Sequence, residues 1–140
     1  MFSLSVLNSA AGVFSIHRGD KGEMTAVASG QETLGYGLLE AYLQYAANDE
    51  PPVLLLYADE PADAIYGQTG GQRESVMLAM LIAPEKAGIL HVGREAADSD
   101  HAEDVATQPD QALVLLSCLR GSAASRWRGP RSNWSWGWDA

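Results

Sequence analysis

The sequence is short of cysteine, of basic side chains and of long apolar runs. Cys118 is the single cysteine in 140 residues, so no disulfide can form within the chain. A lone thiol fits a reducing compartment, and we expect a cytoplasmic protein. The longest apolar runs, residues 53–58 and 76–83, are far shorter than the ~20 residues that a membrane helix needs. We therefore expect no membrane association and, because no basic leader stands at the start, no signal peptide.

Basic residues are half as frequent as acidic ones. The chain has 9 Lys and Arg against 18 Asp and Glu, for a net charge of -9. Affinity for phosphate backbones comes mainly from basic side chains, so the composition argues against nucleic-acid binding. The body of the chain is still more acidic and would repel an acidic partner, since four of the nine basic residues lie near the end: Arg120, Arg126, Arg128 and Arg131.

An apolar content of 46% in 140 residues suffices for one core. We expect a single domain, with an α/β body over residues 1–121 and an Arg- and Trp-rich tail over residues 122–140 that ends in a strand. Spacing of apolar residues predicts helices at residues 9–16, 30–47 and 111–119. It predicts strands at residues 24–28, 53–58, 76–83 and 89–92, the second and third apolar enough to be covered on both faces. This alternation is typical of an α/β layered structure.

The first 85 residues carry an ordered pattern. An Asn-led helix contains Gly12 and the pair Ser15-Ile16, and a turn passes through Gly19 and Gly22. The stretch TAVASG, from Thr25 to Gly30, then opens a long helix, and an apolar strand follows. This order and spacing resemble the active-site region of the β-ketoacyl synthases of the thiolase-like fold. The resemblance is closer to the non-catalytic ketosynthase-like subunits called chain length factors.

The resemblance assigns a meaning to Val27. In catalytic members this position holds the cysteine that accepts an acyl chain from an acyl carrier protein. A thiol on a turn at a helix N-terminus is activated by the dipole and free N–H groups, whereas valine offers no nucleophile. Cys118 lies in an apolar helical segment, where we expect a buried structural thiol. The family's catalytic histidines belong to motifs in its C-terminal half, which this chain does not reach, so we expect no catalytic residue.

The resemblance implies a partial thiolase-like layered fold, with a mixed sheet packed against a buried helix. It implies a non-catalytic subunit of fatty acid or polyketide biosynthesis, in particular of aryl polyene pathways, without cofactor. The implied partner is a catalytic ketosynthase or a second copy in a dimer, with the acyl carrier protein reached through that partner. Two alternatives remain open. One is a stand-alone binding or structural module derived from half of the fold, and the other is an acyltransferase that uses another residue.

Several residues on or near the long helix are candidates for an acyl pocket or a subunit interface. Tyrosines at helical spacing either limit the acyl chain or pack in the core. Ser29 lacks an activating His and carboxylate, so we expect it to cap the helix instead of acting as a nucleophile. The full candidate set is Asn8, Val27, Ser29, Tyr36 and Tyr42.

Tryptophans recur at period two in the tail. In a strand the rings of Trp134, Trp136 and Trp138 face one way, so they either cover the core or form an interface with a partner. The acidic segment 98–104 contains His101 but lacks the glycine and ligand order of a calcium loop. We expect a solvated loop there, and no metal site.

Overall fold

The computed structural model describes residues 7–47, 52–61, 63, 65, 74–84, 88–97, 109–121 and 123–140. Three helices and five strands lie within these ranges. In chain order they are α1 (Ser9–Arg18), α2 (Thr33–Ala47), β1 (Val53–Asp59), β2 (Val76–Ile82), β3 (Ile89–Ala96), α3 (Gln111–Gly121), β4 (Ser125–Arg128) and β5 (Ser132–Asp139). The predicted α/β class is confirmed.

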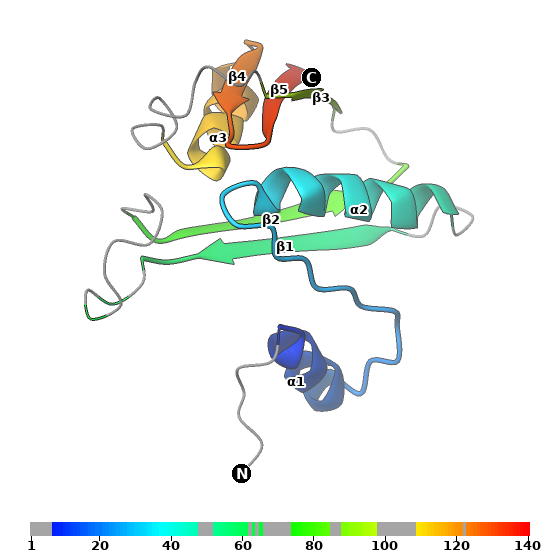
Figure 1. The fold of residues 1–140 in the computed structure, drawn as a ribbon. Helices are drawn as coiled ribbons and strands as arrows, with labels where there is room; N and C mark the ends of the chain where they lie inside the picture. The colour runs from blue at the N-terminus through cyan, green and yellow to red at the C-terminus, as the bar shows by residue number, and fades with distance from the viewer. Residues whose placement is uncertain are drawn as a thin grey trace.

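The strands form two antiparallel sheets. Strand β1 pairs with β2, and β5 lies between β3 and β4. Helix α2 lies between the two sheets, and α3 packs beside β4 and β5 (Figure 1). The layered arrangement around a buried helix was predicted. The sheet was expected to be mixed, however, and every strand pair among the described residues is antiparallel.

Helix α2 buries its first half between the sheets. Leu34 and Leu38 are almost fully buried, and Gly35 allows the ring of Trp134 to lie against the helix backbone. The backbone N–H of Gly35 donates to Oε1 of Gln111 on α3 (2.8 Å). These contacts give α2 a fixed place in the core. The other buried apolar residues of this core are Tyr57, Val76, Ala112, Leu115, Cys118, Trp127 and Trp136.

Strands β1 and β2 were predicted to be covered on both faces, which is wrong for the described part of the chain. Leu55 and Tyr57 of β1 face the core, whereas Leu54 and Leu56 are 55% and 65% exposed. Strand β2 alternates in the same way. Helix α2 covers one face of this sheet, and no described element packs as closely on the other.

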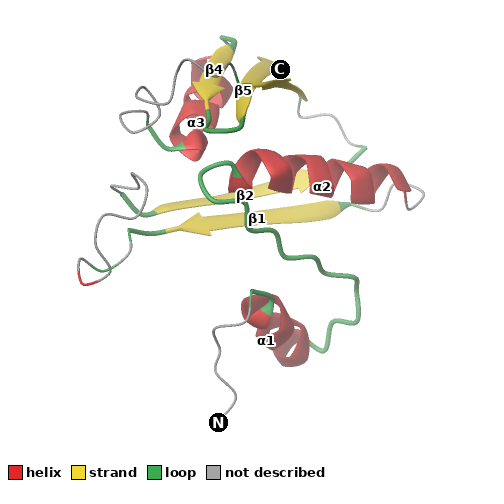
Figure 2. Cartoon of the chain, viewed as in Figure 1, coloured by secondary structure: helices red, strands yellow, loops and turns green. Residues whose placement is uncertain are grey.

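Residues 24–28 were predicted to be a strand, and they run as a loop instead (Figure 2). A strand is defined by hydrogen bonds to a neighbouring strand, and none of the described strands pairs with this segment. Strand β3 extends to Ala96, beyond the predicted end at residue 92, because it pairs with β5 along its whole length. The tail forms two strands where one was predicted.

Helix α1 confirms the first predicted helix and ends at Gly19, whose φ of 64° is the left-handed value that glycine adopts readily. It buries none of its residues and lies on the opposite side of the β1–β2 sheet from α2 (Figure 1). Among the described residues, no helix is both long enough and apolar enough to cross a membrane.

The close approach of Gly35 to Trp134 makes a testable prediction. A Cβ at position 35 would lie 2.7 Å from Cδ2 of the Trp134 ring, so Gly35→Ala should destabilise the chain by about 2 kcal/mol through overpacking. Urea unfolding followed by tryptophan fluorescence measures the change. Gly12→Ala is the matched control, because no atom lies within 4 Å of a Cβ there. It should be neutral or stabilising by up to ~1 kcal/mol.

Candidate functional site at the start of helix α2

Val27 lies in the loop that leads into α2, and its side chain is half-buried. A turn over residues 29–32 separates it from the helix, which begins at Thr33 and not at the predicted Gly30. Gly30 has a φ of 59°, and its carbonyl accepts from the backbone N–H of Thr33 (3.1 Å). The isopropyl group of Val27 therefore lies outside any described strand, and helix α2 follows it.

Ser29 does not cap helix α2, and the prediction that it does is wrong. The turn is closed by Thr33, whose hydroxyl accepts from the backbone N–H of Ser29 (2.8 Å) and donates to the carbonyl of Gly30 (2.7 Å). The Ser29 hydroxyl instead accepts from Nη2 of Arg131 (2.7 Å). The same nitrogen donates to the Ser29 carbonyl (3.0 Å). An arginine from the opposite end of the chain thus holds this turn.

Glu32, the residue before α2, carries a fully buried carboxylate. Its Oε1 accepts from the backbone N–H groups of Arg131 (2.9 Å) and Ser132 (3.2 Å), and its Oε2 accepts from the indole of Trp134 (3.3 Å). Nε of Arg131 lies 3.7 Å from Oε1. Burying a carboxylate is costly unless donors replace its water shell, and three N–H groups do so here. The sequence analysis missed this residue.

Tyr36 is half-buried one turn into α2. Its ring meets that of Trp134 edge to face, with the centroids 5.2 Å apart and the planes at 81°. Two guanidinium groups lie over the ring, with Cζ of Arg94 at 5.4 Å and Cζ of Arg131 at 5.9 Å from its centroid. These distances are within the range of cation–π attraction. Tyr36 therefore belongs to the same cluster as Ser29 and Glu32.

The other candidates are not brought to this cluster. Asn8 is exposed beside α1, and Tyr42 is 59% exposed further along α2. Trp134 and Trp136 are each 1% exposed, so their assignment as interface residues is wrong and the alternative, packing in the core, is confirmed. Trp138 packs partly against the same core. Tyr36 packs partly against the core, whereas Tyr42 is exposed, and a role of either tyrosine in limiting the acyl chain stays a prediction.

Cys118 is 0% exposed on α3, which confirms the predicted buried thiol. No substitute nucleophile with an adjacent base appears at the turn after Val27 within the described residues. The acidic segment 98–104 with His101 lies outside them. Among the residues that the structure does describe, no three His, Cys, Asp or Glu side chains converge in a way that could hold a metal ion.

A second polar cluster lies between β1 and α3. The hydroxyl of Tyr57 lies 3.4 Å from a carboxylate oxygen of Asp59 and 3.4 Å from one of Asp110. Burial is the main cause that raises the pKa of Tyr57 well above its ordinary value, and the nearby carboxylates of Asp110 and Asp59 add to it. The phenol therefore stays protonated and serves as a hydrogen-bonding group. Asp110 caps α3 by accepting from the backbone N–H of Ala112 (2.7 Å). Burial raises the pKa of Asp110. This arrangement joins β1 to α3.

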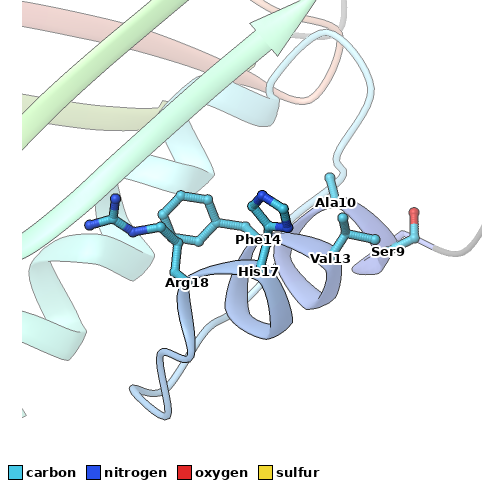
Figure 3. A pocket seen from close by; sticks show the side chains of 6 residues that line it. All are labelled: Ser9, Ala10, Val13, Phe14, His17 and Arg18. Atoms are coloured by element: carbon cyan, nitrogen blue, oxygen red, sulfur yellow. The ribbon is translucent and has the colours of Figure 1, made fainter.

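An open hollow of about 570 Å³ runs along α1 (Figure 3). Its walls come from that one helix, and none of the candidate site residues lines it. The hollow therefore lies along the exposed, mostly apolar side of α1 and is not an enclosed binding site. Its lining residues are Ser9, Ala10, Val13, Phe14, His17 and Arg18.

The described residues place a helix between two sheets, with a glycine turn before it and Val27 in the loop that leads to the turn. The family model for the β-ketoacyl synthase N-terminal domain matches residues 1–137, so the chain belongs to the β-ketoacyl synthase family. Among solved structures, a chain of the complex of the ketosynthase ApeO with its chain length factor ApeC from Xenorhabdus doucetiae is similar, with a TM-score of 0.75 and 20% identity. The match covers 97% of this chain and 56% of that one, so this chain spans little more than half of its length. This likeness confirms the thiolase-like fold. No curated protein matches the sequence.

The role of the buried Glu32 carboxylate can be tested by replacing one of its two oxygen atoms with an amide nitrogen. In Glu32→Gln the amide keeps a single acceptor oxygen, so either the backbone donors of residues 131 and 132 or the Trp134 indole loses its partner. We expect a loss of about 2 kcal/mol in the free energy of unfolding, measured by urea denaturation.

Glu40→Gln on the same helix is the matched control for that variant. Its carboxylate is partly exposed and accepts from the side chain of Gln44, so the change should stay within about 0.5 kcal/mol. Equal stability of the two variants would contradict the role given to Glu32.

Proposed function

We propose that this chain is a non-catalytic ketosynthase-like subunit of the chain length factor type. In this proposal it pairs with a catalytic ketosynthase of fatty acid or polyketide biosynthesis, of which aryl polyene synthesis is the example that the solved complex suggests. The observation that carries the proposal is Val27. Valine cannot form a thioester at the position where catalytic members hold their cysteine, yet the turn and the buried helix around it are kept.

The exposed apolar surface supports a partner-dependent role. One face of the β1–β2 sheet exposes Leu54 and Leu56 together with Met77 (82%) and Leu81 (65%). Contiguous apolar patches of this kind are unusual on an isolated soluble domain and mark surfaces that other protein covers. The matched solved structure is itself a ketosynthase in complex with its chain length factor.

The acyl pocket is proposed to form between the two subunits. Val27 and Ser29 would line its end, Tyr36 and Tyr42 would border it along α2, and Asn8 would lie at its rim. The acidic chain leaves docking of the acyl carrier protein, itself acidic, to the catalytic partner. The assembly would act in the cytoplasm.

Co-expression with a tagged catalytic ketosynthase of an aryl polyene pathway tests the proposal. We expect the chain to co-elute with its partner as a stable complex on size-exclusion chromatography with light scattering. Tyr42→Ala should weaken the complex about tenfold, because exposed tyrosines are enriched among the few interface residues whose truncation removes more than ~1 kcal/mol of binding. Arg120→Ala, on the exposed surface of α3, is the control and should leave assembly unchanged.

Two results would overturn this assignment in different ways. A chain that stays alone beside every ketosynthase tried would favour the stand-alone binding or structural module. Covalent acylation of the isolated chain by an acyl thioester, seen by intact-mass spectrometry, would favour an acyltransferase that uses another residue.

A further inference from the structure

Positive charge gathers beside the turn that follows Val27, on a chain whose net charge is -9. Arg94 comes from β3 and Arg131 from the turn between β4 and β5, and both guanidinium groups lie over the ring of Tyr36. The side chain of Arg131 is 60% exposed, and Arg94 is exposed as well. A cationic surface site thus lies next to the position of the missing nucleophile.

Both arginines are held in place by neighbouring groups. Nε of Arg94 donates to the hydroxyl of Ser132 (2.9 Å), and Nη2 of Arg131 donates twice to Ser29. The backbone around Arg131 is fixed too, since its carbonyl accepts from the N–H of Ala97 (3.0 Å). Ordering of long side chains before a ligand arrives lowers the entropic cost of binding.

Within the part of the chain that the structure describes, each ordered guanidinium group uses only some of its donors. Within the described residues, Nη1 of Arg131 and both terminal nitrogens of Arg94 make no hydrogen bond. Among the described residues, Glu32 is the carboxylate within ion-pair distance of Arg131, and its oxygens already accept three N–H groups. Arg94 makes no ion pair with a described carboxylate, so the two arginines together carry more charge than Glu32 balances within the described residues.

We propose that Arg94, Arg131 and the hydroxyl of Ser29 form a binding site for a phosphate group. Guanidinium groups present paired N–H donors that match the oxygens of phosphate, and these charge-assisted hydrogen bonds are strong. The acidic body repels anions at long range, so binding of phosphate depends on these short-range contacts. The site lies on this chain alone and does not depend on pairing with a ketosynthase.

Titration of the isolated, ¹⁵N-labelled chain with inorganic phosphate at constant ionic strength tests the site. We expect saturable shifts of the Arg94 and Arg131 Nε–H resonances. Arg94→Gln should weaken binding about tenfold through the lost charge-assisted hydrogen bonds. Dimethyl phosphate is titrated in parallel, because it represents a ligand whose phosphate is a phosphodiester, whereas inorganic phosphate represents a free phosphate or a monoester. Saturable shifts with either compound support the site.

Arg126→Gln is the matched control. It removes the same charge from β4, next to the buried Trp127 and therefore on the opposite face of the sheet, and it should leave phosphate affinity within about twofold. If Arg94→Gln unfolds, Arg94→Lys keeps the charge while losing the paired donors, and it should still bind several-fold more weakly. The proposal is overturned if neither phosphate compound gives saturable shifts, or if Arg126→Gln weakens binding as much as Arg94→Gln.

Discussion

The carboxylate of Glu32 joins the start of α2 to the turn between β4 and β5, about one hundred residues later in the chain. Because the three donors come from consecutive or near-consecutive residues of one segment, a single buried group sets both the entry into the helix and the position of β5. Arg131 then reaches back to Ser29, and the Trp134 ring covers Gly35. The turn after Val27, the helix and the second sheet are therefore one connected unit.

The turn after Val27 is held by contacts that do not include Val27. Thr33 closes the turn, and Arg131 holds it from outside. A turn fixed in this way needs no nucleophile to keep its shape. Such a turn suits a subunit whose proposed task is to complete a partner's pocket.

Local patterns of the sequence predicted α1, α2, α3, β1 and β2, because helical and strand periodicity is a local property. They also predicted Cys118 as a buried thiol. The assignment of Val27 to the nucleophile position comes from the family resemblance and stays a prediction. They could not predict the role of Glu32 or Arg131, since the partners of each lie about a hundred residues away and an acidic residue before a helix is ordinarily read as a cap. The strand predicted at residues 24–28 failed for a similar reason: pairing depends on a neighbour that the local pattern does not specify.

The account depends most on the claim that Glu32 holds the β4–β5 turn through backbone hydrogen bonds. Amide hydrogen exchange measures this most directly at Arg131, an exposed residue of the turn whose N–H donates to Glu32, and also at the buried Ser132. Protection close to that of the β5 amides beside Trp134 is the expected result. Exchange as fast as in the exposed loop around Lys21 would show that the carboxylate does not hold this turn, and the connected unit would have to be abandoned.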